Sequence, residues 1–316
     1  MYKLGVLISV YHDESPDLFR RAIASILTQR MTVEAEIRVY LGVDGPVPEA
    51  LDLAIREVEP LLYRVMRFPK NRGLAYVLND LIRSRQDEDF YFRMDTDDVS
   101  HPERFDKQLH YMRAHPEVDV LGTDIVETDA ASAKSHVVHF ADNPVDARRR
   151  ISRRVPVAHP TVSFRARVFD KIAGYPLTHL NEDIAMWFAC LQAGFIFDNV
   201  AEPLYEFRIS KQFWARRSLQ KAWLEFSTYC AGLWALEGVS WKFCFPLLRL
   251  GLRLIPGPLQ KLAYRSMWRT GHPIPASQSS EFFALNRALV GFQSSIKVEA
   301  EMEGASEDVK EIVKRT

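Results

Sequence analysis

The chain has 316 residues, of which 26% are charged and 47% hydrophobic, a composition typical of a folded globular protein with a sizeable core. Its 41 basic and 41 acidic residues give a formal net charge of zero, which argues against a generic nucleic-acid binder, because neutralising phosphates needs a basic excess. Three scattered cysteines, Cys190, Cys230 and Cys244, argue against a disulfide framework or zinc cluster and indicate a reducing compartment. The apolar run after Met1 is too short for a signal peptide or a membrane span, so we expect a cytoplasmic protein.

The first hundred residues alternate apolar β-rich runs, polar loops and helical patterns. We predict strands over 4–10, 37–43, 63–68 and from Phe90, and helices over 18–27, 51–62 and 75–82. Pro102 predicts a further helix start, with Ser100 as N-cap and Glu103 completing a capping box. Repeated strand, loop and helix units predict an α/β fold with a parallel sheet whose strand tips meet at one edge.

The later part of the chain divides into three predicted regions. Strands are expected over 118–126, 136–140, 156–164, 195–199 and 204–208, and helices over 168–172 and from Asn181. We therefore predict a catalytic domain over 1–210, a helical appendage over 211–296 and a charged tail over 297–316.

The predicted appendage is basic and aromatic. Between Gly238 and Ser280 there is no acidic residue, and the basic residues are interleaved with large apolar ones. This composition suits an interfacial element on an anionic membrane, with plain core packing of a helical appendage as the alternative. Pro246, Pro256 and Pro258 break the region into pieces too short to span a bilayer.

Three carboxylates, Asp95, Asp97 and Asp98, follow the fourth predicted strand. Like charges this close repel, and a fold tolerates them where a divalent cation or hydrogen-bond donors compensate. The loop also lies at the edge of the sheet where α/β proteins bind ligands. We interpret Asp97 as a ligand of Mg²⁺ or Mn²⁺ bridging a diphosphate and Asp95 as a contact to ribose or base. The alternative is a solvent-exposed loop with incidental acids.

Other polar residues are expected on the same rim. Asp13 and Asp44 follow the first two predicted strands, although Asp44 is alternatively only a turn former before Gly45. Arg72, beside Gly73, is suited to neutralise a phosphate, and an ordinary surface arginine is the alternative.

Six sequence blocks carry a family resemblance. They are Ile8-Ser9-Val10-Tyr11, Val43-Asp44-Gly45, Asn71-Arg72-Gly73-Leu74 with Leu78-Asn79, Arg93-Met94-Asp95-Thr96-Asp97-Asp98 with Pro102-x-Arg104-Phe105, His159-Pro160-Thr161 and Glu182-Asp183. In this order and spacing, the chain from about Leu4 to Arg208 resembles family 2 glycosyltransferases of the GT-A fold, a mixed sheet flanked by helices. The similarity is strongest to the bacterial branch that builds capsule, exopolysaccharide and O-antigen units.

The resemblance implies roles for individual residues. By this resemblance the nucleoside would be held by Tyr11, Asp13, Asp44 and Asp95, the diphosphate would lie near Arg72, and Asp97 would bind the metal. His159 is a further candidate to position the metal, with a buried structural histidine as the alternative. Asp183 would be the general base at the start of a helix, with a partner of the helix dipole as the alternative.

The implied reaction is metal-dependent, inverting transfer of a hexose from a nucleotide sugar. The expected donor is a UDP-sugar such as UDP-galactose or UDP-glucose. The expected acceptor is a saccharide on a polyprenyl diphosphate such as undecaprenyl diphosphate, so we expect the enzyme to associate peripherally with the inner face of the cytoplasmic membrane.

Two other functions remain as alternatives. Asp95-Thr96-Asp97-Asp98-Val99 also fits the nucleophile motif of haloacid-dehalogenase-type phosphatases, but Arg93 interrupts the strand before it and no later metal pair is found. The other alternative is a non-catalytic carbohydrate- or lipid-binding protein on a transferase fold.

Overall fold

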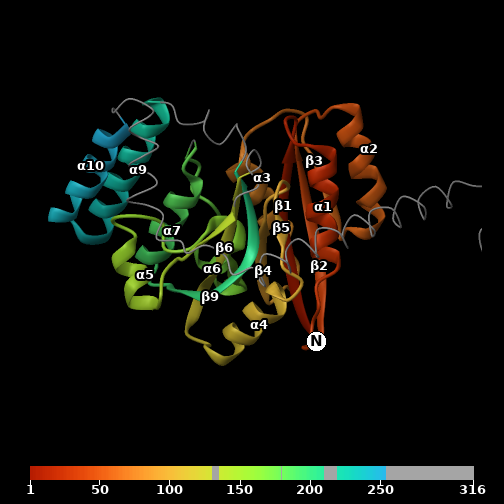
Figure 1. Cartoon of the computed structure of the whole chain (residues 1–316), viewed down its shortest axis with the longest axis horizontal. Coiled ribbons are helices and arrows are strands. Elements are labelled where there is room, and N and C mark those ends of the chain that lie inside the picture. The colour runs from red at the N-terminus through yellow and green to blue at the C-terminus, as the bar shows by residue number, and fades with distance from the viewer. Residues whose placement is uncertain (130–134, 179, 210–218, 254–316) are drawn as a thin grey trace, which may run out of the picture.

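A mixed β-sheet with helices on both faces forms the body of the protein (Figure 1). The computed structural model describes residues 1–129, 135–178, 180–209 and 219–253. Within these ranges the strand order is β3-β2-β1-β4-β8-β6-β9-β5, with β7 paired to β6. The fold is thus the predicted α/β architecture, and the sheet is mixed.

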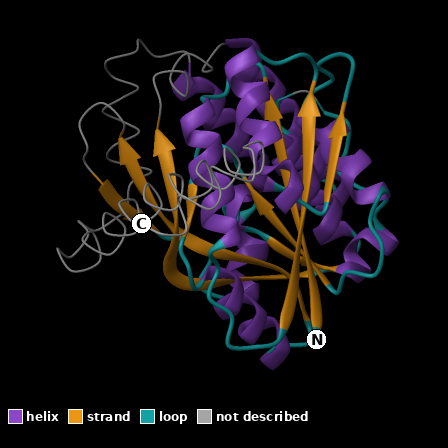
Figure 2. Cartoon of the chain, turned by 90° about the vertical axis from the view of Figure 1, so that its right-hand side faces the viewer, coloured by secondary structure: helices purple, strands orange, loops and turns teal. Residues whose placement is uncertain are grey.

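The predicted parallel half of the sheet is confirmed. It consists of β1 (Tyr2–Tyr11), β2 (Ala35–Asp44), β3 (Arg64–Arg67) and β4 (Phe90–Met94), all mutually parallel. Leu4, Val6 and Ile8 on one face of β1 and Leu7 on the other face are buried, as is expected of a strand covered on both faces. Because the strands run the same way, their carboxyl ends meet at the edge remote from the N-terminus (Figure 2).

The helices divide between the two faces of the sheet. The core on one face includes residues of α1 (Pro16–Leu27), α2 (Glu49–Val58) and α4 (Arg104–Ala114), with the short η1 (Glu59–Leu61) after α2. The core on the other includes residues of α3 (Leu74–Arg83), α5 (Pro144–Arg150), α6 (Ala166–Lys171) and α7 (Glu182–Gln192). Residues of α3 and α7 are thereby brought to the same side of the sheet.

The second half of the sheet differs in detail from the prediction. It contains β5 (Val99–Ser100), β6 (Val118–Asp129), β7 (Ser135–Val138), β8 (Ser163–Arg165) and β9 (Ile196–Ile209). The two strands predicted over 195–199 and 204–208 are one strand, β9, which stays paired to β6 through register shifts on either side of Asp124. The strand predicted over 156–164 is largely wrong, because His159–Thr161 is the 3₁₀ turn η2 and only the last residues pair with β4.

The predicted capping box before α4 is wrong. Ser100 instead lies in β5, opposite Tyr205 of β9, and α4 begins at Arg104 without a side-chain cap from Ser100. Gln29, which follows α1, caps the start of α4 instead. Its Oε1 accepts a hydrogen bond from the Phe105 amide (3.0 Å), and its Nε2 donates to the His101 carbonyl (2.8 Å). The helix start is satisfied by a residue distant in sequence, which a local motif cannot predict.

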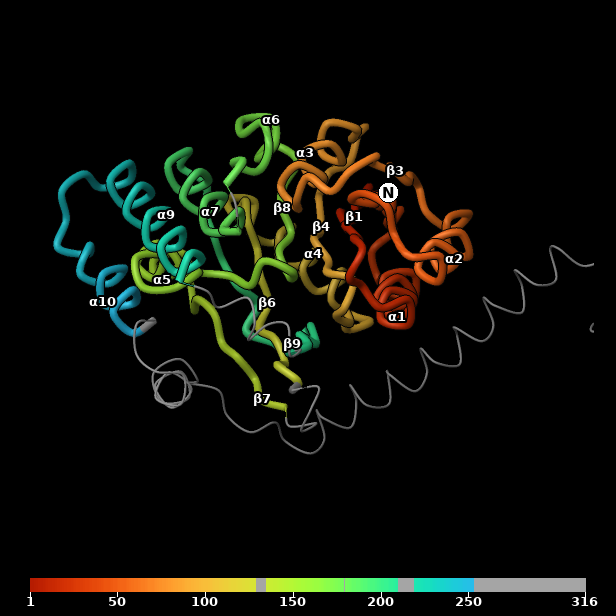
Figure 3. Tube along the Cα trace, turned by 90° about the horizontal axis from the view of Figure 1, so that it is seen from above, coloured from red at the N-terminus to blue at the C-terminus, as the bar shows by residue number. Residues whose placement is uncertain are grey.

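The C-terminal described segment forms a helical hairpin against α7 (Figures 1 and 3). It consists of α9 (Leu219–Glu237), η3 (Trp241–Phe243) and α10 (Cys244–Arg253). Gly232 permits the close approach, because a Cβ there would lie 2.2 Å from the Phe188 ring of α7. Residues 211–218 and 254–296 of the predicted appendage and the predicted tail 297–316 lie outside the described residues. Within the described ranges, no helix has the length and apolarity to cross a membrane.

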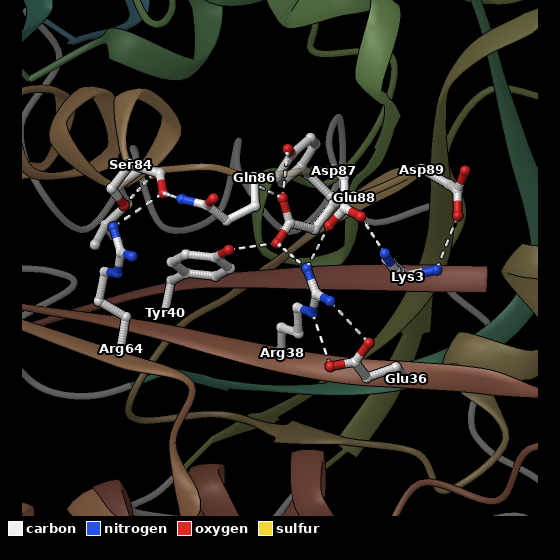
Figure 4. A network of polar contacts seen from close by, with 12 residues as sticks. Lys3, Glu36, Arg38, Tyr40, Arg64, Ser84, Gln86, Asp87, Glu88 and Asp89 are labelled. Atoms are coloured by element: carbon white, nitrogen blue, oxygen red, sulfur yellow. Dashed lines mark hydrogen bonds and ion pairs between the residues drawn. The ribbon is translucent and has the colours of Figure 1, made fainter. Parts of the chain in front are cut away.

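A buried ionic network joins β1, β2 and β4 at the opposite edge of the sheet from the acidic loop (Figure 4). Glu88, whose side chain is fully buried, accepts hydrogen bonds from the hydroxyls of Tyr40 and Tyr91 and pairs with Arg38. Arg38 also pairs with Glu36 and Asp87. Each of these charged and hydroxyl groups is ion-paired or hydrogen-bonded within the network, which indicates that the network has a structural role.

Glu88→Ala is expected to lower the unfolding free energy by about 2–4 kcal/mol, because two buried hydroxyls and a buried guanidinium lose their shared acceptor. Denaturant unfolding measures the change. Glu88→Gln, which keeps an acceptor, is the control and should lose less. Equal stability of Glu88→Ala and the wild type would show that the network contributes nothing.

Candidate active site

Asp44, at the end of β2, organises the loop before α3. Its buried carboxylate accepts hydrogen bonds from the backbone amides of Arg72 and Gly73, each at 2.8 Å. Gly45 is needed beside it, since its φ is +88° and a Cβ would lie 2.6 Å from the Asn71 nitrogen. Asp44 thus does more than form a turn: it attaches the Arg72 loop to the rim of the sheet.

Arg72 is held at this rim by its own neighbours. Its guanidinium pairs with Asp80 of α3 and lies over the Phe68 ring at 4.5 Å, while the side chain remains 30% exposed. A guanidinium fixed in this way presents positive charge beside the Asp44 loop, where the sequence predicts a diphosphate.

Tyr11 and Asp13 lie at the end of β1. Tyr11 is half-buried and is directly opposite Asp44 in the β1–β2 register. Asp13 is exposed, with its carboxylate 3.1 Å from His12 Nδ1. The two early acids predicted on the rim therefore follow neighbouring strands, as expected.

The acidic loop after β4 holds its three carboxylates in different environments. Asp95 and Asp97 are half-buried, whereas Asp98 is 1% exposed and accepts a hydrogen bond from the Arg208 amide of β9 (2.8 Å). Burial, followed by the charges of Asp97 and Asp95, raises the pKa of Asp98 well above its usual value. Asp98 anchors the loop to β9, and Asp95 and Asp97 are left as the more exposed acids.

Two buried guanidinium groups lie behind this loop. Arg93 of β4 pairs with Asp95 and is 2% exposed. Arg104 of α4 is fully buried and donates hydrogen bonds to the carbonyls of Arg93 (3.0 Å) and Pro160 (3.1 Å). Burial lowers the pKa of Arg104 to about 10, so it remains a cation at neutral pH. Arg104 thereby links the end of β4 to η2.

His159 and Tyr175 form a polar pair next to Arg93. His159 Nε2 lies 3.0 Å from the Tyr175 hydroxyl, and burial together with the Arg93 charge lowers the pKa of His159 well below its usual value. Asn79 of α3 holds the Tyr175 backbone by accepting from its amide (2.6 Å) and donating to its carbonyl (2.9 Å). The residue before Tyr175 is Gly174, with φ +135°, where a Cβ would lie 2.2 Å from Asn79 Oδ1.

Asp183 lies in the first turn of α7. Its Oδ1 accepts a hydrogen bond from the Ile184 amide (2.8 Å), and burial, followed by the nearby Glu182 charge, raises its pKa to about 6. The turn before α7 is strained, since Leu180 has φ +66°, the one positive φ among non-glycine residues of the described ranges. With its side-chain amide oriented to satisfy both groups, Asn181 donates to the Leu180 carbonyl and accepts from the Glu225 amide of α9 (3.1 Å).

Tyr175 connects the two ends of the candidate site. Its ring contacts that of His159 edge-on, with the centroids 5.4 Å apart, and the His159 ring lies 5.8 Å from the Trp187 ring of α7. The structure therefore brings the acidic-loop side and the start of α7 to one region, while Tyr11, Asp13, Asp44 and Arg72 lie along the strand tips. No site role is predicted from the sequence for Arg93, Asn79 or Tyr175. Asn79 and Arg93 belong to the sequence blocks that carry the family resemblance, and Arg93 is also a charge within an apolar strand.

The acidic loop suits a cation that takes most of its ligands from a substrate. No group of three or more His, Cys, Asp or Glu side chains able to hold a metal occurs in the described part of the chain. Asp97 and Asp95 are hard oxygen donors of the type that Mg²⁺ and Mn²⁺ prefer, and such ions keep other positions for phosphate and water. His159 is engaged by Tyr175 and lies beside the Arg93 cation.

Two family models match the chain. The model described as Glycosyl transferase family 2 matches residues 6–173, and the model described as Glycosyl transferase family group 2 matches residues 92–270. Both ranges include the acidic loop.

Several curated proteins are similar in sequence. An uncharacterized glycosyltransferase of Haemophilus influenzae is 30% identical over 276 residues, covering 84% of this chain and 99% of that protein. The amylovoran biosynthesis glycosyltransferase AmsE of Erwinia amylovora is 33% identical, covering 65% and 75% of the two chains. The Escherichia coli UDP-Gal:α-D-GlcNAc-diphosphoundecaprenol β-1,3-galactosyltransferase is 26% identical, covering 68% and 77%.

Among solved structures, the mannosyltransferase PcManGT from Pyrobaculum calidifontis, in complex with GDP-Man and Mn²⁺, is similar in fold. It has a TM-score of 0.56 at 14% sequence identity, with 95% of this chain and 86% of that chain covered. The match to the family 2 model and to the H. influenzae relative favours a glycosyltransferase over the phosphatase and non-catalytic alternatives.

Proposed function

Because the chain belongs to glycosyl transferase family 2, we propose that it transfers a hexose from a nucleotide sugar to a lipid-linked saccharide during bacterial surface polysaccharide synthesis. The similarity to a glycosyltransferase of amylovoran biosynthesis supports this proposal. We propose a UDP-sugar as donor and a saccharide on undecaprenyl diphosphate as acceptor, the donor and lipid carrier named for the E. coli relative. The observation that carries this proposal is the half-buried acid pair Asp95 and Asp97 at the parallel strand tips, with Asp183 in the first turn of α7, a helix that packs in the same core cluster as Tyr175.

We assign the donor site to the strand tips. Tyr11, Asp13, Asp44 and Asp95 would contact the nucleoside, and Arg72 would lie by the diphosphate. Asp97 would hold Mn²⁺ or Mg²⁺, which supplies positive charge to the departing diphosphate. We assign His159 to positioning, through its contact with Tyr175.

We assign Asp183 as the general base. The acceptor oxygen would bond to the anomeric carbon as the carbon–oxygen bond to the diphosphate breaks, and the acceptor proton would pass to Asp183. Its raised pKa suits proton abstraction near neutral pH, and its contact with the Ile184 amide orients the carboxylate. A single displacement of this kind inverts the configuration at the anomeric carbon.

A ligand screen tests this proposal. UDP, GDP and dTDP, each with and without Mn²⁺, are compared for their effect on the melting temperature of the full chain, and UDP with Mn²⁺ is expected to raise it most. Hydrolysis of UDP-galactose and UDP-glucose then identifies the donor. Stabilisation by none of the three nucleotides would overturn the proposal.

We further propose that the α9–α10 hairpin lies on the membrane interface. Leu219, Trp223 and Trp234 project from a common side of α9 by helical periodicity, each more than half exposed, and Trp241 of η3 is 69% exposed. Tryptophan favours the lipid headgroup region, because it joins an apolar ring to a polar N–H. Two of the basic residues expected to attract an anionic membrane are already in ion pairs, Lys242 with Glu237 and Arg249 with Glu225. These two residues therefore contribute less to membrane attraction than the sequence alone indicates.

Replacing Trp223, Trp234 and Trp241 together by Ser is expected to reduce sedimentation with phosphatidylglycerol-containing vesicles by about tenfold or more, because three interfacial anchors are lost. Nucleotide binding should be unchanged. Leu53→Ser with Leu61→Ser, two comparably exposed apolar residues of α2 and η1, is the matched control and should sediment like the wild type. Equal sedimentation of the triple variant and the control would contradict membrane docking through the hairpin.

A further inference from the structure

Arg93 places a permanent positive charge inside the β4 strand. Its neighbours in the strand, Phe92 and Met94, are fully buried and apolar, and the Arg93 side chain is 3% exposed. A guanidinium does not lose its proton in a protein, so this charge is present at every working pH. Burying it is costly, which indicates that its position has a use.

The Arg93 charge is directed at the acidic loop. The guanidinium pairs with Asp95, whose side chain is 31% exposed, and its Nε has no hydrogen-bond partner among the described residues. Arg104 supports the arrangement from behind by donating to the Arg93 carbonyl. The pair therefore consists of a buried cation and an acid that reaches the surface of the loop.

This pairing reduces the attraction of the loop for a free cation. Asp95 is compensated by Arg93, so a divalent ion approaching alone gains little beyond its interaction with Asp97 and is repelled by the guanidinium. A nucleoside diphosphate brings further negative charge and oxygen ligands. The combined site then becomes favourable for the ion.

We propose that Arg93 is a positioning residue that makes capture of Mn²⁺ or Mg²⁺ by the acidic loop conditional on the nucleotide diphosphate. The inference rests on the proposed function and adds to it a residue that controls the order of assembly. Because coupling between two ligands is reciprocal, the ion should strengthen nucleotide binding by the same factor as the nucleotide strengthens ion binding.

The coupling factor is measurable without catalysis. Mn²⁺ binding to the full chain is followed by electron paramagnetic resonance with and without UDP, and UDP binding by calorimetry with and without Mn²⁺. The wild type is expected to bind Mn²⁺ alone weakly and together with UDP tightly. Arg93→Met is expected to bind Mn²⁺ alone about tenfold more tightly or better, and its coupling factor should fall about tenfold or more.

Three further variants separate the effect of the Arg93 charge on binding from an effect on folding. Arg38→Met is the matched control, because it removes a largely buried, ion-paired arginine of β2 that belongs to the network at the opposite ends of the strands (Figure 4). It should lower stability and leave the coupling factor unchanged. If Arg93→Met fails to fold, Asp95→Asn is compared with the double variant Asp95→Asn/Arg93→Met, and the double variant should bind Mn²⁺ alone at least tenfold more tightly.

The outcomes distinguish this inference from the proposed function. No binding of UDP or GDP by the wild type would overturn the proposed function and this inference together. Two results would overturn the inference alone, in a chain that binds nucleotide. One is a coupling factor of Arg93→Met within twofold of the wild type, and the other is an Mn²⁺ affinity of the double variant within twofold of Asp95→Asn.

Discussion

Asp97→Asn is expected to reduce sugar transfer by about a thousandfold or more, because the substitution removes the charged ligand that we assign to the metal at the departing diphosphate. The amide nearly preserves the size of the side chain, so the fold should persist. The increase in melting temperature that Mn²⁺ and UDP produce together in the wild type should disappear. Initial transfer rates and thermal unfolding with and without ligands measure the two effects.

Asp98→Asn is the matched control for Asp97→Asn. Asp98 is buried, its pKa is raised well above the usual value by burial and by the charges of Asp97 and Asp95, and it accepts a hydrogen bond from the Arg208 amide. An asparagine oxygen can accept the same bond, so we expect less than about a tenfold loss of transfer. Equal losses in the two variants would contradict the assignment of different roles to these neighbouring acids.

Asp183→Asn is expected to lower the rate constant of transfer by about a thousandfold or more while UDP with Mn²⁺ still binds, because proton removal from the acceptor is lost and the donor site is untouched. In the wild type the rate should rise with pH through about 6, as the Asp183 carboxyl, whose pKa is about 6, loses its proton. Steady-state kinetics over pH 5–8 measure both effects. A rate profile without this rise, in a chain that transfers sugar, would exclude Asp183 as the base.

The same substitution should stabilise the protein at high pH. The folded-state pKa of Asp183 lies above its ordinary value of 3.8, so folding favours the protonated form, and this preference is lost as pH rises through about 6. Above that pH the native state keeps a half-buried charge that Asn lacks, and Asp183→Asn should gain about 1–3 kcal/mol at pH 8 and much less at pH 4, where the carboxyl is mostly protonated in the native state. Denaturant unfolding at the two pH values tests the sign. A loss of stability at pH 8 would indicate that the charge serves the fold.

The parallel half of the fold was predictable because its determinants are local. Strands β1, β2 and β4 are mostly apolar, β-rich runs separated by polar loops, and each can be predicted from its own residues. The clustering of Asp44 and Asp95 at one edge follows from the parallel direction of their strands. The errors occur where an element depends on distant partners, as in the continuous strand β9 and in the α4 start that Gln29 satisfies.

By itself, the sequence determined the fold class, the family, the acidic loop and its rim, since hydrophobic period, loop residues and motif order are properties of the linear chain. Only the tertiary structure decided that Asp98 anchors the loop to β9, that Arg93 pairs with Asp95, and that Asn79 fixes Tyr175 between the acidic loop and Asp183. The tertiary structure also shows that Lys242 and Arg249 form ion pairs within the helical hairpin. The reason is physical: the role of a charge depends on its burial and its partners, and both arise only when segments far apart in the chain are packed together.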